Sequence, residues 1–368
     1  MTPLAALLAR RIALQGPIAL SEYMAECLLN PDHGYYTTRD PFGQAGDFVT
    51  APEISQMFGE MLGLCLAQVW LDQGRPARFA LAELGPGRGT LMADILRAIR
   101  AVPGMTEAAQ VHLVEASATL RRAQAVRLAA HEVIWHDTIA TLPEAPLFLV
   151  ANEFFDALPI RQFERRGGAW AERQVGLGPE GNLGPGLAPA APLAALAHRL
   201  GDTREGDIVE TCPAAPPIAA DIAGRIARCG GVALIIDYGG WRSLGDTFQA
   251  LRAHQGEDPF ANPGEADLTA HVDFEPIASA ARAAGAAASA LIPQGVLLER
   301  LGITARAQTL ARGLGGATLA SHIAAHRRLT HPAEMGSLFQ TLAIYPASAA
   351  PPPGFDPAVM KDPDADHA

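Results

Sequence analysis

The stretch Phe79-Ala-Leu-Ala-Glu-Leu-Gly-Pro-Gly-Arg-Gly-Thr-Leu-Met-Ala-Asp-Ile-Leu96 decides the fold of this 368-residue chain. An apolar segment runs into three closely spaced glycines, Gly85, Gly87 and Gly89, and an amphipathic helix follows at once. Such a turn lets the backbone approach a ligand closely at the N-terminus of the helix. The dinucleotide pattern G-x-G-x-x-G is not met, because Thr90 stands at its sixth position and the spacing is G-x-G-x-G.

Short apolar segments alternate with helical segments after this turn, which is typical of a parallel sheet covered by helices. The further predicted strands are residues 111–115, 133–135, 147–151, 232–237 and 338–345. Residues 160–163 and 170–177 are expected to form an antiparallel hairpin on the same sheet, and residues 178–200 a loop. The predicted fold class is therefore α/β, a Rossmann-like, mostly parallel sheet with antiparallel additions.

Composition divides the chain into three parts. Residues 1–75 are predicted to form a helical N-terminal lid or cap. Residues 76–345 are expected to be the α/β core, with an insertion at about 239–330 that is irregular at first and helical towards its end. Residues 346–368 are rich in Pro and acidic residues, and this composition predicts a disordered tail.

Acidic side chains stand where the first three predicted strands end. Glu83 precedes the glycine turn, and its carboxylate suits a cationic ligand better than a pyrophosphate. Glu115 ends the next strand, where a carboxylate in folds of this kind accepts hydrogen bonds from ribose hydroxyls. Asp137 ends the strand after that. A solvated acid at Glu115 and a helix N-cap at Asp137 are the ordinary structural alternatives.

The fourth predicted strand ends in Asn152, Glu153 and Asp156, with Phe154 and Phe155 between the two acids. Ligands bind at the carboxyl ends of strands in open α/β sheets, so these polar residues mark the expected catalytic edge. A helix N-cap beside core phenylalanines is the alternative. Because Glu153 and Asp156 are three residues apart, both can face one pocket only if the chain turns after Asn152.

With these motifs in view, the sequence resembles the MidA-like family of class I S-adenosylmethionine-dependent methyltransferases. The G-x-G-x-G turn behind an acidic residue resembles the first motif of that class. The other motifs that carry the resemblance are Glu22–Met24, Asn30-Pro31, Gly34–Tyr36, Gly46–Gln56, Phe58–Glu60, Asn152–Asp156 and Ala266–Phe274. One departure is Ala51, where members of the family carry Ser.

The resemblance implies S-adenosyl-L-methionine as the cofactor, held by Glu83, the glycine turn and Glu115, with Asp137 at the adenine amino group. It also implies a protein substrate, because the family includes the mitochondrial protein arginine methyltransferase that helps to assemble respiratory complex I. On this hypothesis Glu153 and Asp156 hold the substrate arginine, and Asn152 belongs to the same catalytic set.

The segment from Gly46 to Glu60 has no role in a bare methyltransferase fold, and we interpret it as a lid with Asp47 and Glu53 near the pocket. Thr50 and Glu53 have the spacing of a capping box at the start of a long apolar helix. A plain capped helix is the alternative interpretation of this segment.

Charge and hydropathy limit the partners that the chain can have. A net charge of −11 argues against nucleic acid, and no segment offers the ~20 apolar residues of a membrane span. The N-terminus shows no apolar signal region before Arg10, so we expect a protein of the bacterial cytoplasm. No metal site is expected, because the histidine pair His322 and His326 lies beside two arginines.

Two other functions remain open at this point. One is a methyltransferase that acts on a small molecule. The other is a non-catalytic, S-adenosylmethionine-binding assembly chaperone, for which the long N-terminal segment and the insertion offer docking surfaces. The sequence names neither the methyl acceptor nor the oligomeric state.

Overall fold

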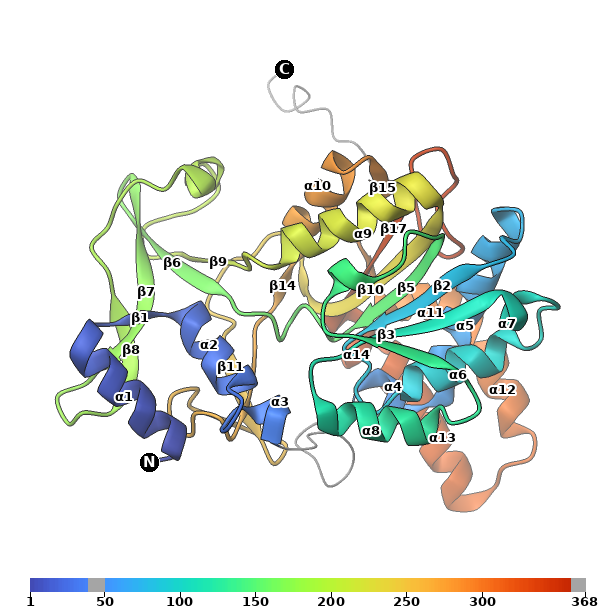
Figure 1. The fold of residues 1–368 in the computed structure, drawn as a ribbon, viewed down its shortest axis with the longest axis horizontal. Helices are drawn as coiled ribbons and strands as arrows, with labels where there is room; N and C mark the ends of the chain where they lie inside the picture. The colour runs from blue at the N-terminus through green and yellow to red at the C-terminus, as the bar shows by residue number, and fades with distance from the viewer. Residues whose placement is uncertain (39–49, 359–368) are drawn as a thin grey trace.

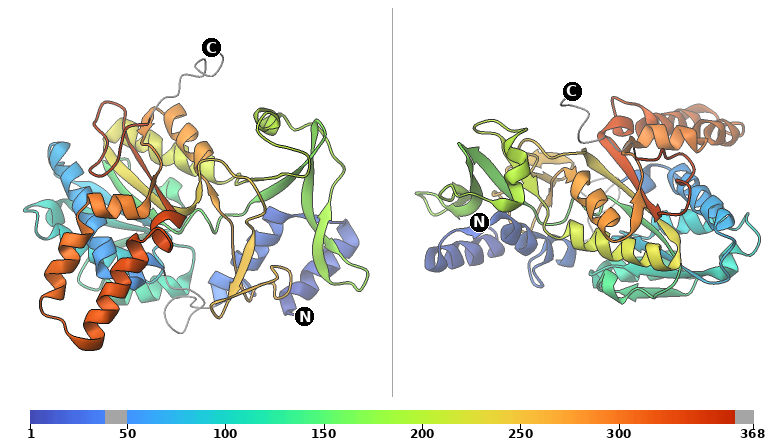
Figure 2. Two further views of the ribbon diagram at one scale, coloured as in Figure 1. Left: turned by 180° about the vertical axis from the view of Figure 1, so that it is seen from behind. Right: turned by 90° about the horizontal axis from the view of Figure 1, so that it is seen from above.

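The computed structural model describes residues 1–38 and 50–358, and these residues form a larger and a smaller lobe (Figure 1). The larger lobe is built around a mixed β-sheet with helices on both faces. The smaller lobe combines the N-terminal helices with separate antiparallel strands, and Figure 2 shows the same two lobes from behind and from above. The predicted α/β fold class is confirmed.

The sheet of the larger lobe has its strands in the order β15 (Ala286–Ala288), β17 (Phe339–Pro346), β10 (Gly231–Gly240), β5 (Leu147–Asn152), β2 (Phe79–Leu84), β3 (Ala109–Val114) and β4 (Val133–His136). The strands from β10 to β4 are parallel to one another, and β17 is antiparallel to β10 and to β15. β14 (Val272–Asp273) pairs with β10, and β16 (Ile292–Pro293) pairs with β17.

The order of the strands in the sheet indicates where a ligand can bind. From β2 the chain moves outward to β3 and β4, and it then returns to β5 on the other side of β2. The connections that leave β2 and β5 therefore diverge, and a crevice opens at their carboxyl ends. The glycine turn follows β2 and the Asn152–Asp156 segment follows β5, so both predicted motifs meet at this crevice.

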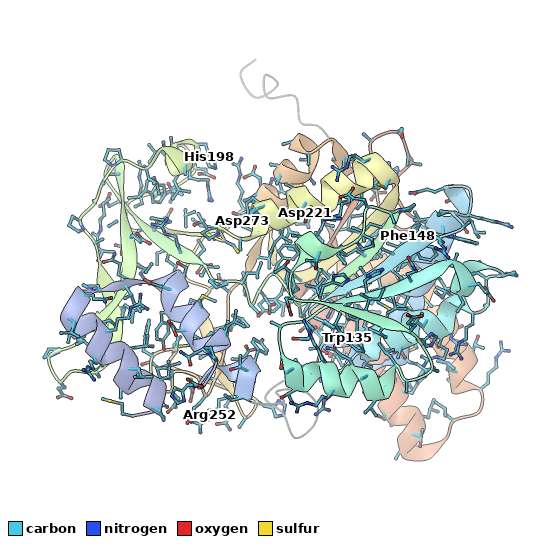
Figure 3. The ribbon with its side chains drawn as sticks, in the orientation of Figure 1. Trp135, Phe148, His198, Asp221, Arg252 and Asp273 are labelled. Carbon is cyan, nitrogen blue, oxygen red and sulfur yellow. The ribbon has the colours of Figure 1, made fainter. Side chains whose placement is uncertain are left out.

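Apolar residues on both faces of the sheet hold the helices of the larger lobe. On one face α5 (Gln56–Asp72) and α6 (Thr90–Ile99) pack through Leu62 and Ile95 onto Phe148 and its neighbours; Phe148 is labelled in Figure 3. On the other face α9 (Ala215–Cys229) and α10 (Phe274–Ala283) pack through Ile222 and Ile277. The strands are apolar on both sides for this reason, as is usual in a parallel sheet.

The remaining helices of the larger lobe surround this framework. They are α4 (Ala51–Ile54), α7 (Met105–Ala108), α8 (Ala118–Arg127), α11 (Gln294–Arg300), α12 (Ile303–Ala311), α13 (Gly316–Thr330) and α14 (Met335–Leu338). Leu298 and Leu329, from α11 and α13, belong to the same core cluster as α5 and α6. Among the described residues, no helix is both long and apolar enough to cross a membrane.

The smaller lobe has a core of its own. Its helices are α1 (Pro3–Gln15), α2 (Leu20–Leu29) and α3 (Tyr35–Thr38), and its strands are β1 (Ile18–Ala19), β6 (Arg161–Arg166), β7 (Ala169–Leu177), β8 (Leu183–Leu187), β9 (Ile208–Thr211), β11 (Gln249–Arg252), β12 (Gln255–Glu257) and β13 (Asp267–Thr269). Leu8, Tyr23 and Val175 are buried together in this core. The helical residues 1–75 are thus shared between two cores, and the division of the chain into three parts stays a prediction.

The sequence prediction was wrong about the partners of the hairpin at residues 160–177. β6 and β7 do form it, but β7 pairs with β1 and β6 pairs with β9, so it belongs to the smaller lobe and not to the main sheet. Alternation along a strand shows that it is a strand and does not name its neighbour.

Four segments are more ordered or more divided than predicted. The expected loop at 178–200 contains β8 and the 3-10 helix η2 (Ala194–Leu200), and the irregular part of the insertion contains the three-stranded sheet β12-β11-β13. The helical end of the insertion is divided between α12 and α13, where Gly313 and Gly315 stand. Residues 346–358 of the expected tail pack on the larger lobe through the buried Phe355, whereas residues 359–368 lie outside the described residues.

The capping box is also wrong in its details. Thr50 is the N-cap residue of α4, but its side chain makes no capping hydrogen bond. Ser55 interrupts the helix, and its Oγ accepts from the Met57 N–H at the start of α5. Glu53 accepts instead from the hydroxyl of Thr90, at the first turn of α6. Asp47 lies outside the described residues.

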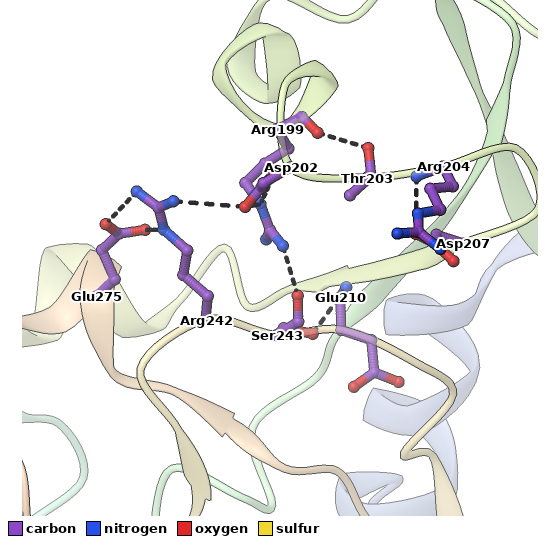
Figure 4. A network of polar contacts seen from close by, with 9 residues as sticks. All are labelled: Arg199, Asp202, Thr203, Arg204, Asp207, Glu210, Arg242, Ser243 and Glu275. Carbon is purple, nitrogen blue, oxygen red and sulfur yellow. Dashed lines mark hydrogen bonds and ion pairs between the residues drawn. The ribbon is translucent and has the colours of Figure 1, made fainter. Parts of the chain in front are cut away.

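A buried arginine connects the two lobes (Figure 4). Arg199 of η2 donates from Nε to both carboxylate oxygens of Asp202 at 3.0 Å, and from Nη2 to the Ser243 carbonyl at 2.8 Å. Arg242 of the larger lobe donates to Asp202 at 3.4 Å and to both oxygens of Glu275 on α10. The chain from Arg199 to Glu275 thus ties η2 to the segment after β10.

We expect the variant Arg199→Ala to lower the free energy of unfolding by about 1–3 kcal/mol, because the Ser243 carbonyl and the Asp202 carboxylate lose a charged donor. Urea denaturation followed by circular dichroism measures this change. The matched control is Arg204→Ala, which truncates a nearby exposed side chain. Arg204 takes part in the contacts of Figure 4 through its backbone N–H, which the substitution keeps, so the stability should change by less than about 0.5 kcal/mol. Equal stability of the two variants would show that the network contributes nothing.

Candidate functional site

A cavity of about 780 Å³ lies at the crevice between β2 and β5 and extends to the smaller lobe. Its volume falls within the range of small-molecule sites in proteins. The ends of β2, β3, β4 and β5 contribute to its wall, and so do residues of α2, α3, β11, β13 and α14. The cavity therefore joins the predicted cofactor motif to the smaller lobe.

The glycine turn forms one wall of this cavity. Gly85, Gly87 and Gly89 have φ values of +60°, +52° and +77°, a left-handed backbone that other residues rarely adopt. Gly85 and Gly87 line the cavity, and a Cβ atom at Gly85 would lie 3.1 Å from the ring of Phe154. Gly89 is not a lining residue and is instead the N-cap of α6. The turn thus exposes backbone groups at the start of that helix.

Glu83 lies in the same wall, just before the turn, and is 3% exposed. Burial raises the pKa of its carboxyl group to about 8. Its Oε2 atom is buried and has no hydrogen-bond partner among the described residues. A buried acceptor of this kind costs free energy unless a ligand supplies a donor or a positive charge.

Glu115 and Asp137 line the same cavity in different surroundings. Glu115 is buried, and its Oε1 accepts from the Ser117 N–H at 2.7 Å. Asp137 is largely exposed and forms an ion pair with Arg121 at 2.5 Å. Both residues line the cavity, so the acids predicted at the ends of β3 and β4 meet where Glu83 and the glycine turn also lie.

Gln124 is a residue of this site that the sequence analysis missed. It is fully buried in α8, and its Nε2–H group donates to the Gly87 carbonyl at 2.8 Å and to Glu115 Oε2 at 3.2 Å. Its side-chain carbonyl accepts from the indole of Trp135 at 2.8 Å; Trp135 is labelled in Figure 3. One side chain thus fixes the glycine turn relative to Glu115. The sequence feature that could have identified Gln124 is a polar residue on the apolar face of a helix.

The end of β5 brings Asn152, Glu153 and Asp156 to the cavity. Glu153 has a φ of +52°, and this left-handed residue turns the chain directly after the strand. The turn lets Glu153 and Asp156 line one cavity although they are three residues apart. Unfavourable backbone conformations of non-glycine residues are commonly retained at functional sites.

Two donors orient the Glu153 carboxylate. Its Oε1 accepts from the Asn152 amide at 2.9 Å and from the Ala51 N–H of α4 at 3.2 Å. Burial raises the pKa of Glu153 to about 8, and the nearby charge of Asp156 adds to the shift. Burial also raises the pKa of Asp156 above its ordinary value.

Asp237, which the sequence analysis also missed, accepts hydrogen bonds from the backbone of the segment after β5. It is fully buried at the end of β10, and its Oδ2 accepts from the Phe155 N–H at 3.0 Å and from the Asp156 N–H at 3.3 Å. Its Oδ1 accepts from the Tyr238 N–H at 3.0 Å. The signal was an acid that ends the apolar run of residues 232–236.

The short helix α4 touches both ends of the site. Its Ala51 N–H donates to Glu153, and its Glu53 accepts from Thr90 beside the glycine turn. Glu53 also lines the cavity. α4 therefore contacts both the start of α6 and the segment after β5, and its role as a lid stays a prediction.

These features fit S-adenosylmethionine at the end formed by the glycine turn. Its sulfonium and amino groups are cationic, which suits the unpartnered buried oxygen of Glu83. Its ribose hydroxyls suit the buried carboxylate of Glu115, and its methionine part needs the close backbone approach that the left-handed glycines allow. The residues present therefore fit the group that the motif predicts.

Comparison with known proteins agrees with this geometry. Residues 61–292 match the model of an S-adenosyl-L-methionine-dependent methyltransferase family, and the chain belongs to this family. It is therefore an S-adenosylmethionine-dependent methyltransferase, and the resemblance seen in the sequence is confirmed.

Individual relatives extend the similarity over most of the chain. The protein named protein arginine methyltransferase NDUFAF7, mitochondrial, of Xenopus laevis is 38% identical over 92% of this chain and 83% of its own length. The human protein of the same name is 36% identical over 94% of this chain and 84% of its own length. A crystal structure from Burkholderia thailandensis, bound to S-adenosyl-homocysteine, has 31% identity and a TM-score of 0.80, covering 97% of this chain and 93% of its own.

We expect Gly87→Val to abolish the binding of S-adenosylmethionine, because Gly87 lines the cavity and a β-branched residue is strained at its φ of +52°. Isothermal titration calorimetry measures the affinity. The matched control is Gly181→Val, a left-handed glycine of the smaller lobe with no atom near its Cβ position. Unchanged affinity in the Gly87 variant would contradict the assignment of this turn.

The raised pKa of Glu153 predicts a pH-dependent gain in stability for Glu153→Gln. A folded-state pKa of about 8, above the ordinary 4.5, gives a contribution that is complete below about pH 4.5 and is lost as the pH rises through about 8. Glutamine does not ionise, so its advantage over glutamate should grow across this range. Urea denaturation of the ligand-free protein at about pH 5 and about pH 9 measures it. A difference that does not change with pH would contradict the burial of this charge.

Proposed function

We propose that this chain is a protein arginine N-methyltransferase whose acceptor is an arginine of a respiratory complex I subunit. The relatives named above are called protein arginine methyltransferases, at 36–38% identity over nearly the whole chain. The observation that carries the proposal in this chain is a pair of acids, the partly buried Glu153 and the buried Asp156, which line the cavity that the glycine turn also lines. Such a pair suits a cationic acceptor.

At the cofactor end, we propose that Glu83, Gly85, Gly87, Glu115 and Asp137 bind S-adenosylmethionine, while Gly89 forms the start of α6. The cofactor supplies an electrophilic methyl group on a sulfonium. Glu83 offers a buried negative charge near the turn, and Gln124 keeps Glu115 in place through its hydrogen bond. Asp137, held by Arg121, forms the outer edge of this end.

At the acceptor end, we propose that Glu153 and Asp156 hold the guanidinium and that Asn152 positions Glu153. Arginine is a poor nucleophile, because its charge is delocalised and its pKa lies far above neutral pH. Carboxylates that bind two of its nitrogens bias the charge away from the third and fix its direction of attack. Glu153, with a pKa of about 8, can accept the proton that leaves as the C–N bond forms.

The location and other partners of the protein are part of the same proposal. A complex I subunit is a protein partner that binds at the rim of the cavity. The curated relatives are described as mitochondrial proteins, and we propose a bacterial cytoplasmic location for this chain on its sequence composition alone. The absence of nucleic-acid partners stays a prediction from the net charge of −11.

The test is methyl transfer from radiolabelled S-adenosylmethionine to complex I subunits that were prepared from a strain lacking this protein. We expect label on a subunit and methylarginine in its hydrolysate. The variant Glu153→Gln should keep the cofactor affinity and lose about a hundredfold or more of the rate, because the proton acceptor is gone. The control Glu132→Gln, which changes an exposed glutamate outside the cavity, should methylate at the parent rate.

The same experiment separates the other functions. Label on extractable small molecules would favour a small-molecule methyltransferase. No label on any acceptor, with cofactor affinity intact, would favour an assembly chaperone. Parent-level methylation by the Glu153→Gln variant would contradict the proposed role of this carboxylate.

A further inference from the structure

Two motifs from the sequence analysis, Gly34–Tyr36 and Ala266–Phe274, have no part in the mechanism above. Both lie in or beside the smaller lobe, and both reach the cavity. Tyr36 of α3 and Asp267 of β13 line it together with the residues at the end of β5. The acceptor end of the cavity is therefore built by both lobes.

One hydrogen bond orients Asp267, and a second one holds the segment after β13 beside the end of β5. The Tyr36 hydroxyl donates to Asp267 Oδ1 at 2.8 Å. The Ala270 N–H donates to the carbonyl of Asp156 at 3.0 Å, and this bond joins the segment after β13 to the catalytic edge. Asp267 is 5% exposed, and its negative charge contributes to the raised pKa of Glu153. The carboxylate thus lies within electrostatic range of the catalytic acids.

The same region contains buried oxygen atoms that lack a donor. Asp156 and Asn152 are 6% and 8% exposed and line the cavity, and the Oδ1 atom of each has no hydrogen-bond partner among the described residues. Buried acceptors and like charges at close range are unfavourable unless a ligand supplies N–H donors and positive charge. A bound cation would satisfy both needs at once.

We propose that Asp267, oriented by Tyr36, is a third carboxylate of the acceptor subsite, and that the subsite selects a guanidinium over an ammonium. This inference rests on the proposed function, because it extends the site of Glu153 and Asp156. A guanidinium presents five N–H donors in a planar fork and can bind carboxylates on more than one edge. An ammonium is a compact charge with three donors and cannot span acids from two lobes in the same way.

The test is direct binding of two probes to the protein saturated with S-adenosylhomocysteine. The probes are the blocked tripeptide acetyl-Gly-Arg-Gly-amide and its lysine counterpart, each measured by calorimetry. We expect the parent protein to prefer the arginine peptide. Asp267→Asn should weaken that affinity about tenfold or more, because a charged hydrogen bond is lost. Tyr36→Phe should weaken it less, since the carboxylate remains and only its orientation is released.

The matched control is Glu180→Gln, which removes a carboxylate from an exposed position of the same lobe outside the cavity. It should bind both probes as the parent does. The affinity for S-adenosylhomocysteine should be equal in all variants, and this readout also shows that each variant is folded. If Asp267→Asn does not fold, the Tyr36→Phe variant tests the subsite by itself.

Three results would overturn the inference: no binding of the arginine peptide to the parent, equal affinity for the two peptides, or parent-level affinity in Asp267→Asn. A different set of results would contradict the proposed function and leave the inference intact. If the arginine peptide binds and Asp267→Asn weakens it, but no methylarginine forms on any protein, the subsite stands and the arginine methyltransferase assignment fails. If methylarginine forms at the parent rate in Asp267→Asn with unchanged affinity, only the inference fails.

Discussion

The hydrogen bonds from the Phe155 and Asp156 N–H groups to Asp237 hold the part of the molecule on which the site depends. They bind the turn after β5 to the end of β10, and Glu153 is joined to the same strand by its N–H bond to the Ile236 carbonyl. The left-handed turn at Glu153 is unfavourable by itself, so it needs this support. Once the turn is held, Glu153 and Asp156 both line the cavity beside the glycine turn.

Burial of these acids links function to stability. Glu83 and Asp156 are buried in the cavity wall and Glu153 is partly buried there, and the loss of contact with solvent raises the pKa of each. A charged acid in such a wall destabilises the ligand-free protein, and bound cationic groups offset that cost. The cofactor and the acceptor are both cationic on our account, so each would stabilise the wall that binds it. The contacts of α4 with Glu153 and Thr90 connect the two ends of the site.

Local sequence pattern was sufficient for the α/β class, the strands around the glycine turn, and the placement of Glu83, Glu115 and Glu153 at the cavity. These residues directly follow or end apolar strands, so their neighbours in sequence determine their positions. Local pattern could not reveal the roles of Gln124, Asp237 and Asp267. Their hydrogen-bond partners lie 37, 82 and 231 residues away in the sequence. It also misplaced the hairpin at residues 160–177, because a strand pattern does not specify pairing partners.

The most direct test of the central claim is a crystal structure of the complex with S-adenosylhomocysteine and an arginine-containing peptide. Our account predicts the homocysteine part against Gly85 and Gly87, and the guanidinium within hydrogen-bond distance of Glu153 and Asp156. A guanidinium bound outside the cavity, or a cofactor product bound away from the glycine turn, would contradict the account.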